Sequence, residues 1–381
     1  MPHPQFPQER DITYLNHAGV GAWPQHAADA VAAFAAENAR RGAAGYMRWL
    51  ETERRLRQRC ATLIGAAASE DVALVKNTSE ALSFIAEGLA WEPGDEVVIN
   101  RREFPSNRIP WEALQDRGVV VRDPYLDPMD PEAALIDALG PRTRLLTVSA
   151  VQYGDGLRMD LPRLAAACKA NGTLFCVDAI QQLGALRFDL ADVDADFVVA
   201  DGHKWMLGPE GLGLFYCRPS LRPALRLTQY GWHMVRDAGN YETKEWEPAQ
   251  SAQRFECGSP NLLAIHGLEA SLAVLQDEVG MATVESGVLD NTRHLLARIA
   301  ASSTLETISD TRAERLSGIV TFRAPGADNK ALYRALRSEG VMCAARGGGV
   351  RLSPHFYIDR EQLDYAIERA EALVGACPQA G

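Results

Sequence analysis

The 381-residue sequence predicts an α/β protein, with a mostly parallel central sheet flanked by helices and a smaller α+β domain at the C-terminal end. The first observation is that strand, polar turn and helix recur in that order over roughly 150 residues, as in a parallel sheet covered on both faces. The second is a change, from about Asn261 onward, to long helices and short alternating strands. A chain of this length usually divides into two domains, so we expect a large α/β domain over residues 22–255 and a small α+β domain built from residues 1–21 and 256–381.

The N-terminal segment predicts a short strand followed by two helices. Ile12–Leu15 is mostly apolar and runs into the polar, glycine-containing turn Asn16–Gly21. Residues 24–63 are rich in alanine and arginine, which favours helix, but Gly42–Gly45 should break the helix into two because glycine is a poor helix former.

Strands and helices then alternate through the middle of the chain. The predicted strands are Val72–Val75, Glu96–Ile99, Leu145–Ser149, Leu174–Asp178, Phe197–Ala200 and Gly211–Cys217. The predicted helices are Ala81–Leu89, Pro110–Arg117, Leu161–Ala170 and Gln181–Gly184. In such sheets ligands bind beyond the carboxyl ends of the strands, so polar residues at those ends are candidate site residues.

The C-terminal part predicts the smaller domain. Helices are expected at Leu262–Glu278, Val284–Ala301, Lys330–Glu339 and Arg360–Val374, and strands at Ser317–Phe322 and Gly349–Ser353.

The composition excludes several classes of protein. A formal net charge of -11 is unlike the basic surface that binds nucleic acid. The seven cysteines form no C-x-x-C pair, which argues against a disulfide framework or a zinc site. No signal peptide is recognisable, and no apolar run approaches the ~20 residues that span a bilayer. We therefore expect a cytoplasmic protein with no metal, nucleic-acid or membrane partner.

Lys204 is the first candidate for chemistry. It follows the buried strand Phe197–Ala200 and the turn Asp201-Gly202-His203. A lysine amine that is partly removed from water has a lowered pKa and can attack a carbonyl carbon. The alternative is a surface lysine in a turn.

Polar residues at other strand ends add to this candidate site. The hydroxyls of Thr78 and Ser79, at a strand-to-helix junction, could hold a phosphate, or could simply cap the helix. Asp178 ends the strand Leu174–Asp178, where a buried carboxylate needs a cationic partner; the alternative is a helix cap for Ala179–Gly184.

These residues together match the needs of pyridoxal 5'-phosphate (PLP), an electron sink whose ring nitrogen must stay protonated and whose aldehyde bonds to a lysine. The aspartate at position 178, the lysine at position 204 and a distal arginine pair are all present.

At this point the sequence resembles the class V aminotransferase family, which includes cysteine desulfurases, cysteine C–S lyases and isopenicillin N epimerase-like proteins. The resemblance extends from Tyr14–Gly19 to Val350–His355, and its motifs are Asp178-Ala179-Ile180-Gln181, Asp201-Gly202-His203-Lys204 and Arg254-Phe255-Glu256-Cys257-Gly258-Ser259-Pro260-Asn261. It implies the PLP-dependent transferase fold type I and a homodimer.

The resemblance also implies roles for individual residues. Lys204 would bind the cofactor covalently, Asp178 would pair with its ring nitrogen, and Gln181 would hydrogen-bond its phenolic oxygen. The phosphate would be held by Thr78, Ser79, His203 and, from the second subunit, Ser259. Phe104 would stack on one face of the ring and Ile180 would pack on the other, although Phe104 is also suited to an ordinary core position.

The substrate end of the site would be built from the two arginines. The resemblance favours Arg351, with Arg346 beside it, for the substrate α-carboxylate, because a guanidinium binds a carboxylate bidentately. The alternative for both is a surface salt bridge. The resemblance places Tyr153, Gln152 and His17 near the same substrate.

Three departures from the family pattern shape the expected activity. The loop Gly347–Gly349 has no cysteine where desulfurases carry a nucleophilic one, and Cys343 before it suits a small buried hydrophobe. We therefore expect an enzyme that is not a persulfide-forming cysteine desulfurase. Asp201 replaces a hydroxyl residue and should point away from the phosphate, and Phe104 replaces a histidine.

The expected function is PLP-dependent Cα deprotonation of an α-amino acid, ending in transamination or β-elimination of the C–S lyase type. Trp205, Trp232 and His233 could line a pocket for a bulky side chain. Two alternatives stay open: an amino-acid racemase or epimerase, and a catalytically silent scaffold of the same fold. A nucleotide site at Gly208–Gly213 is disfavoured, because its glycine order differs from G-x-G-x-x-G.

Overall fold

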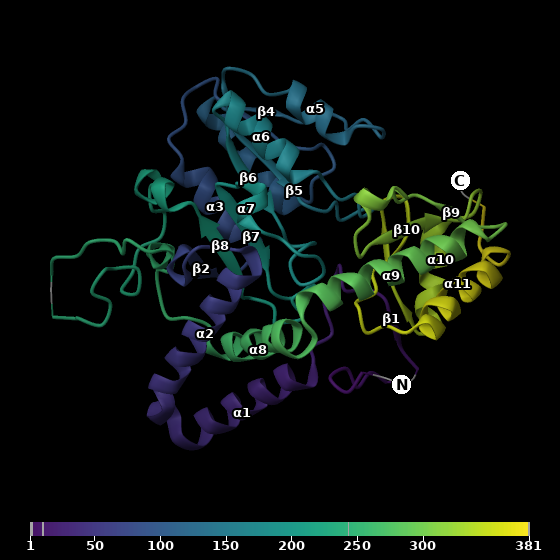
Figure 1. The fold of residues 1–381 in the computed structure, drawn as a ribbon, viewed down its shortest axis with the longest axis horizontal. Coiled ribbons are helices and arrows are strands. Elements are labelled where there is room, and N and C mark those ends of the chain that lie inside the picture. Colours follow the sequence, from purple (N-terminus) through teal and green to yellow (C-terminus); the bar gives the residue numbers. More distant parts are fainter. Residues whose placement is uncertain (1–2, 10, 243, 380–381) are drawn as a thin grey trace.

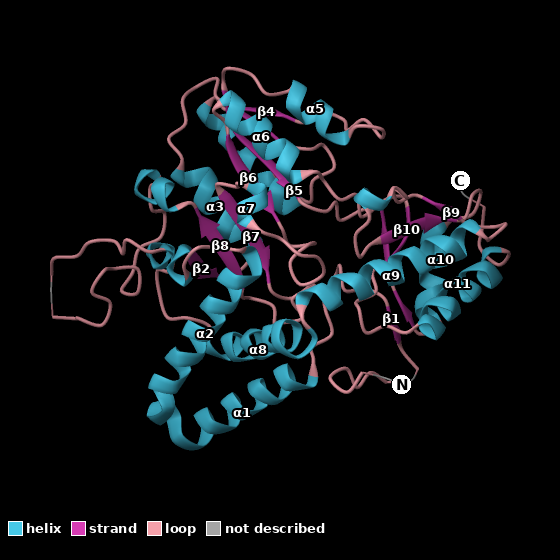
Figure 2. Cartoon of the chain, viewed as in Figure 1, coloured by secondary structure: helices cyan, strands magenta, loops and turns pink. Residues whose placement is uncertain are grey.

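The computed structural model describes residues 3–9, 11–242 and 244–379, and it contains a large and a small body (Figure 1). The large body holds the strands β2 to β8, and the small body holds β9 and β10 with α10 and α11, while α9 runs between the two. Figure 2 shows the strands of the large body surrounded by helices and a second, separate group of strands in the small body.

The central sheet has seven strands in the order β2-β8-β7-β6-β5-β3-β4. Only β8 runs against its neighbours β2 and β7; the other pairings are parallel. Its strands are β2 (Val72–Val75), β3 (Glu96–Val98), β4 (Val120–Arg122), β5 (Thr143–Ser149), β6 (Leu174–Asp178), β7 (Phe197–Asp201) and β8 (Gly213–Cys217). The predicted α/β class with a mostly parallel central sheet is thus confirmed.

Both faces of this sheet are buried, which explains the continuous apolar runs in its strands. In β7, Val198 and Ala200 belong to one hydrophobic cluster, whereas Phe197 and Val199 belong to the cluster on the opposite face. The helices α2, α6 and α8 contribute to the first cluster, and α3 and α4 contribute to the second.

Five helices of the large body agree with the predicted pattern apart from their ends, whereas the helices at Pro131–Asp137 and Leu190–Val193 were not predicted. The helices are α1 (Gln25–Arg41), α2 (Tyr46–Ile64), α3 (Thr78–Gly88), α4 (Ile109–Glu112), α5 (Pro131–Asp137), α6 (Leu161–Asn171) and α7 (Leu190–Val193). The break between α1 and α2 is a short 3-10 helix at Gly42–Gly45, as predicted, and Gly42 there has a φ of 52° that a side chain would strain.

One predicted helix is wrong. Residues 180–184 form consecutive turns in place of a helix. Asp178 Oδ1 accepts a hydrogen bond from the Ile180 amide at 3.1 Å, and Gly184 has a φ of 94°, so the backbone turns away from a helical path.

The small body is built from both ends of the chain. Its sheet has the order β12-β13-β10-β9, and β1 pairs with β11 in parallel, which brings residues 13–14 beside residues 341–342. The strands are β1 (Thr13–Tyr14), β9 (Glu306–Thr307), β10 (Val320–Arg323), β11 (Val341–Met342), β12 (Ala344–Arg346) and β13 (Gly349–Leu352). The later helices are α8 (Leu262–Ala273), α9 (Met281–Ala300), α10 (Asn329–Ser338) and α11 (Arg360–Val374).

Helix α8 continues into a π-helix at Val274–Val279, which accounts for the longer helix predicted at Leu262–Glu278. It packs against α1 and α2 of the large body, whereas α9 packs against α11. The predicted domain limits at residues 22 and 255 stay a prediction. Within the described residues, no helix combines the length and the apolar character that crossing a membrane requires.

Candidate active site

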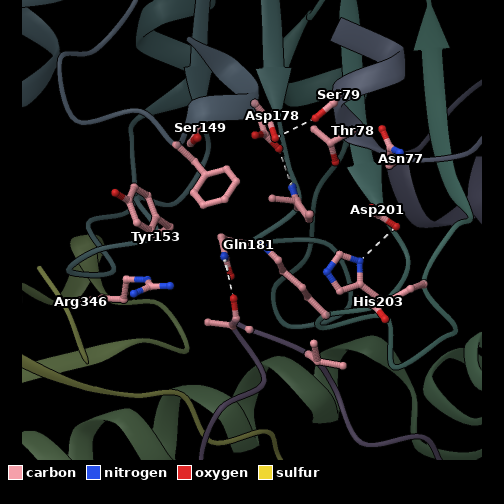
Figure 3. Close-up of a pocket in the computed structure, with 18 of the residues that line it drawn as sticks. Asn77, Thr78, Ser79, Ser149, Tyr153, Asp178, Gln181, Asp201, His203 and Arg346 are labelled. Carbon is pink, nitrogen blue, oxygen red and sulfur yellow. Dashed lines mark hydrogen bonds and ion pairs between the residues drawn. The ribbon is translucent and has the colours of Figure 1, made fainter. Parts of the chain in front are cut away.

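A pocket of about 350 Å³ opens at the carboxyl ends of β6 and β7 (Figure 3). The strand register explains its position, because Ser149 of β5 pairs with Asp178 of β6 and Asp178 pairs with Val199 of β7. The predicted site residues that line it are Thr78, Ser79, Phe104, Tyr153, Asp178, Ile180, Gln181, His203, Lys204, Arg346 and Arg351.

Asp178 is a buried carboxylic acid at the base of the pocket. Burial, assisted by the nearby acids Glu103 and Asp201, raises its pKa to about 7, although the Ile180 amide and Lys204 oppose this shift. The proton on a cofactor ring nitrogen would supply the positive charge that such a carboxylate lacks.

Lys204 is the reactive amine of the pocket. Burial lowers its pKa to about 8, and the positive charge of Arg351 contributes, so the neutral nucleophilic form is accessible near neutral pH. Its Nζ lies 5.6 Å from the centre of the Phe104 ring. The turn that carries it is tight, since Leu207 N donates to Lys204 O at 3.1 Å and Leu207 has a φ of 57°.

The helix α3 presents two hydroxyls that its capping does not use. Asn77 is the N-cap, and its side chain accepts from the Glu80 amide at 2.9 Å. Thr78 Oγ1 is buried without a hydrogen-bond partner, and Ser79 Oγ donates to Ser106 Oγ at 2.9 Å. The capping alternative for Thr78 and Ser79 is therefore wrong, and both hydroxyls line the pocket beside the N-terminus of a helix, where an anion is favoured.

His203 and Asp201 lie at the same end of the pocket. His203 Nδ1 is 3.1 Å from Asp201 Oδ1, and both residues line the cavity (Figure 3). Asp201 was expected to point away from the phosphate; it lines the pocket, and its orientation relative to a bound phosphate stays a prediction. The positive charge of the nearby Lys204 offsets the negative charge of Asp201.

The Phe104 side chain lines the pocket and is not part of the hydrophobic core. Its side chain is 40% exposed and meets Tyr153 edge to face, with ring centres 5.2 Å apart. Ile180 also lines the cavity, as stacking on the other ring face requires.

The substrate end contains two arginines in different environments. Arg351 is only 3% exposed; its Nη1 donates to Tyr153 O at 2.7 Å, and its Nε has no partner. Burial lowers its pKa to about 10, and Arg346 adds to this effect. Arg346 is exposed, and its Nη1 donates to Ala345 O at 2.9 Å.

Three predicted site residues do not line the pocket. His17 is fully buried; its Nδ1 donates to Ser353 O at 2.9 Å and its Nε2 accepts from Tyr357 Oη at 2.7 Å, so both ring nitrogens are used. Gln152 Nε2 donates to Glu103 Oε1 at 3.0 Å, which turns it away from the substrate. Ser259 lines a separate hollow of about 220 Å³.

The prediction that Trp205, Trp232 and His233 line a pocket for a bulky side chain is also wrong. Trp205 is fully buried and donates to Gln181 Oε1 at 2.8 Å, while Trp232 and His233 lie outside the lining of the cavity.

Several lining residues were missed. They are Ala18, Gly19, Val20, Asn77, Ser106, Ser149, Asp201 and Glu210. Ser149 could have been found, because it ends a predicted strand next to the strand of Asp178. Its amide donates at 2.9 Å to Glu103 Oε1, so a buried acid holds this part of the pocket wall in place.

The residues present fit PLP. Thr78 Oγ1 and Arg351 Nε are buried polar atoms without hydrogen-bond partners among the described residues, and both residues belong to the lining of one pocket. Buried polar groups without partners are rare in proteins unless a ligand or water satisfies them. The lining also combines hydroxyls, an acid, an amine and guanidinium groups, which match the phosphate, the ring nitrogen and the aldehyde of PLP and the carboxylate of a substrate.

The fold and this pocket define an α/β enzyme that uses PLP. A model of the family described as Aminotransferase class-V matches residues 13–365, and the chain belongs to that family. It is 29% identical to a probable cysteine desulfurase of Methanothermobacter thermautotrophicus, over 97% of this chain and 96% of that protein. It is 29% identical to the isopenicillin N epimerase of Streptomyces clavuligerus, over 84% of each protein.

Solved structures share the fold. The complex of the cystine C–S lyase C-DES with its reaction product cysteine persulfide superposes with a TM-score of 0.89, at 23% identity, over 96% of this chain and 99% of that chain. A C-DES mutant with glycine covalently linked to its PLP cofactor superposes with a TM-score of 0.90, at 22% identity, over 97% of this chain and 99% of that chain. The predicted fold type and the PLP cofactor are thus confirmed.

The prediction that the protein is not a persulfide-forming cysteine desulfurase is contradicted by these comparisons. Relatives are named cysteine desulfurase, and a structural neighbour holds cysteine persulfide as its product. The prediction relied on the absence of a cysteine from Gly347–Gly349. That absence does not decide the matter, because cleaving the C–S bond of a disulfide substrate leaves both sulfur atoms on the leaving group, and a persulfide forms without a protein thiol.

Cys343 agrees with its predicted structural role. It is buried in the hydrophobic cluster of the small body, and burial raises its pKa to about 12.

Proposed function

We propose that this protein cleaves the C–S bond of a sulfur-containing α-amino acid by PLP-dependent β-elimination. The observation that carries the proposal is that Asp178, Lys204 and Arg351 line one pocket. An acid for the ring nitrogen, an amine for the Cα proton and a guanidinium for the α-carboxylate are the groups that the reaction needs.

When bound, the cofactor supplies an electron sink for the electrons of the Cα–H bond. Asp178 would hold the proton on the ring nitrogen, and Thr78, Ser79 and His203 would bind the phosphate. Gln181 would donate to the phenolic oxygen, and Phe104 and Ile180 would cover the two faces of the ring.

Arg351 orients the substrate through its carboxylate, so that the Cα–H bond faces Lys204. The Lys204 amine takes the Cα proton, the Cβ–S bond breaks, and sulfur leaves with the bonding electron pair and receives a proton. With one water molecule consumed, the products are pyruvate, ammonia and the sulfur-bearing leaving group. Cystine would yield cysteine persulfide in this way.

Transamination and epimerisation share the first proton transfer and differ only in where the proton returns. The epimerase alternative is supported by the likeness to isopenicillin N epimerase. The scaffold alternative is disfavoured, since a protein without catalysis has no need of Lys204, Asp178 and Arg351 in one pocket.

A homodimer is part of the proposal. Ser259 and Cys257 line the separate hollow of about 220 Å³, so Ser259 does not reach the phosphate end of its own pocket. A second copy of the chain would bring its Ser259 there. Ser259→Ala should then weaken cofactor binding without changing the pocket of its own chain.

Seven free cysteines support a reducing compartment such as the cytoplasm.

The test is a product assay with the purified holoenzyme on cystine, cysteine, β-chloroalanine and alanine in deuterated water. Pyruvate with persulfide or sulfide supports β-elimination, whereas alanine with a persulfide on an acceptor thiol overturns it in favour of desulfuration. Deuterium at Cα without cleavage, or conversion of the cofactor to its amine form alone, overturns it in favour of an epimerase or a transaminase. Lys204→Ala should abolish every activity, whereas Lys169→Ala, at an exposed lysine, should not.

A further inference from the structure

Three side chains that can bind a metal ion meet where α2 passes beside the edge strand β2 (Figure 1). Glu53 belongs to α2, His233 lies in the long segment after β8, and Glu256 directly follows the 3-10 helix Ala252–Phe255. One oxygen or nitrogen atom of each residue lies within 4.8 Å of those of the other two. None of the three lines the PLP pocket, so the chemistry described above does not account for this cluster.

Arg57, one turn after Glu53 on α2, links the two carboxylates. Its Nη2 donates to Glu53 Oε1 at 2.8 Å and to Glu256 Oε2 at 3.1 Å, and its Nη1 donates to Glu256 Oε1. The backbone amide of Leu74, on β2, also donates to Glu256 Oε1, at 2.9 Å. These bonds hold both carboxylates in place, as outer hydrogen bonds do for the ligands of a metal ion.

The atoms that these bonds leave without partners indicate a missing ligand. Glu53 Oε2 and His233 Nδ1 are buried and have no hydrogen-bond partner among the described residues. Glu53 is only 7% exposed, and His233 Nδ1 lies 3.8 Å from Glu256 Oε2, which is too far for a hydrogen bond. Buried polar atoms without partners are rare unless an ion, another ligand or water satisfies them.

The charges of the cluster favour a cation. Among the described residues, Arg57 is the one arginine or lysine at ion-pair distance from Glu53 or Glu256. With His233 in its neutral, metal-binding form, two buried carboxylates and one guanidinium leave one negative charge uncompensated. Because an uncompensated charge is costly in a buried place, a bound cation would stabilise this arrangement.

We propose that Glu53, His233 and Glu256 bind one divalent transition-metal ion, of which Zn²⁺ is the best suited. Imidazole and carboxylate ligands both bind zinc, and three protein ligands with water complete its usual coordination. Donor atoms about 2.1 Å from one ion at a tetrahedral angle lie about 3.4 Å apart, so each atom would have to move by less than about 1 Å.

The cysteine spacing that argues against a zinc site does not bear on these ligands, which are carboxylates and an imidazole. The ion would join α2 to the segment that leads to Ser259, and its role is structural. This inference does not depend on the proposed C–S cleavage.

The test measures Zn²⁺ binding by the purified holoenzyme after a chelator has removed other metals. Calorimetry should show one Zn²⁺ per chain, and Co²⁺ at the same site should give visible bands at wavelengths beyond the absorption of the cofactor. Zn²⁺ should raise the temperature at which the holoenzyme unfolds, because a ligand of the folded state stabilises that state. Mg²⁺ should bind far less tightly, because it prefers octahedral oxygen coordination.

Glu53→Gln and His233→Gln should each raise the Kd for Zn²⁺ at least about 10- to 100-fold, which is the loss that changing even an outer partner of a metal ligand causes. Glu53→Gln keeps the size of the side chain and an oxygen for Arg57, so the variant should fold. Glu51→Gln, at an exposed glutamate of the same helix, and His26→Gln, at an exposed histidine, are the matched controls and should leave the Kd unchanged.

A holoenzyme that binds no Zn²⁺ would show that the cluster is an ion-pair network alone, and would overturn the inference. Zn²⁺ binding that either Glu53→Gln or His233→Gln leaves unchanged would place the ion elsewhere, for instance at the cofactor or a cysteine, and would overturn it as well. Neither result depends on the C–S cleavage assay, so the inference and the proposed function can fail separately.

Discussion

Trp205 Nε1 donates a 2.8 Å hydrogen bond to Gln181 Oε1, and Gln181 Nε2 donates to Ala18 O at 3.1 Å. The amide of Gln181 is thereby fixed with its oxygen already in use and one N–H free at the pocket. Because Trp205 directly follows Lys204, one turn of the chain positions both the amine and the hydrogen-bond donor.

We expect Trp205→Phe to release this amide. A donor to the phenolic oxygen stabilises its anionic form, so the midpoint of the pH titration of the bound cofactor's visible band should shift. A shift of one pH unit corresponds to a change of about 1.4 kcal/mol in this stabilisation. The free energy of unfolding should fall by about 1–3 kcal/mol, because a buried acceptor loses its donor. Trp232→Phe, at a tryptophan that is 38% exposed, is the control. An unchanged midpoint beside a lowered stability would mean that Trp205 serves packing alone.

Thr78→Val should weaken cofactor binding. Thr78 Oγ1 is buried without a partner, and valine keeps the shape while removing the hydroxyl. Loss of a hydrogen bond to a charged group should raise the Kd for PLP about tenfold or more, measured by fluorescence titration of the cofactor-free protein. The same variant should not destabilise the cofactor-free protein, because the hydroxyl makes no bond there. Thr62→Val, at an exposed position of α2, should leave the Kd unchanged; an unchanged Kd in Thr78→Val itself would remove Thr78 from the phosphate site.

Covalent attachment of PLP to cofactor-free protein should accelerate as the pH rises through about 8. Burial lowers the pKa of Lys204 from 10.5 to about 8, so the neutral amine that attacks the aldehyde accumulates above that value. Absorbance stopped-flow gives the rate, and mass spectrometry after borohydride reduction locates the bond. A rate that rises only near pH 10 would show that the amine is not desolvated.

Stability should fall as the pH drops from 6.5 towards 4. His355 is fully buried between Trp205 O, to which Nε2 donates at 3.1 Å, and the Phe356 amide, from which Nδ1 accepts at 2.9 Å. Burial lowers its pKa to about 4, so the unfolded chain binds a proton in this range and the folded chain does not. The expected loss is about 3 kcal/mol, measured by urea unfolding across pH. His355→Gln should flatten this slope, and His26→Gln, at an exposed histidine, should not. A wild-type slope in His355→Gln would assign the effect to other groups.

Cys343→Ala should leave activity within about twofold. The thiol is buried, burial raises its pKa to about 12, and the thiol does not line the pocket, so it is not available as a thiolate. Steady-state assays on cystine and cysteine measure the effect, and Cys257→Ala, at a partly exposed cysteine, provides the comparison. A loss of activity confined to Cys343→Ala would make Cys343 the sulfur acceptor.

Six of the seven strands of the central sheet could be predicted to within two residues at each end, whereas β4 (Val120–Arg122) was not predicted. Leu174–Asp178 matches β6, and Phe197–Ala200 differs from β7 by one residue, because strands buried on both faces are continuous apolar runs. Asp178 and Lys204 follow from the same rule, since the ends of adjacent parallel strands meet at one edge of the sheet.

The orientation of other predicted site residues depends on hydrogen-bond partners that lie far away in the sequence. Gln152 faces Glu103, and His17 faces Ser353 and Tyr357, so neither side chain reaches the pocket. The persulfide prediction was wrong for a different reason: it inferred a product from one missing side chain, whereas the substrate can carry the second sulfur itself.

The sequence by itself determined most of the alternation of strands and helices and the acid and amine at two strand ends, because burial on both faces leaves a local apolar pattern. Tertiary structure alone decided which polar side chains share the cavity. The Arg351 guanidinium, for instance, is directed by the carbonyl of Tyr153, 198 residues earlier in the chain. Such a contact cannot be predicted from the local sequence, because a buried guanidinium hydrogen-bonds to whichever acceptor the packing of the two bodies places beside it.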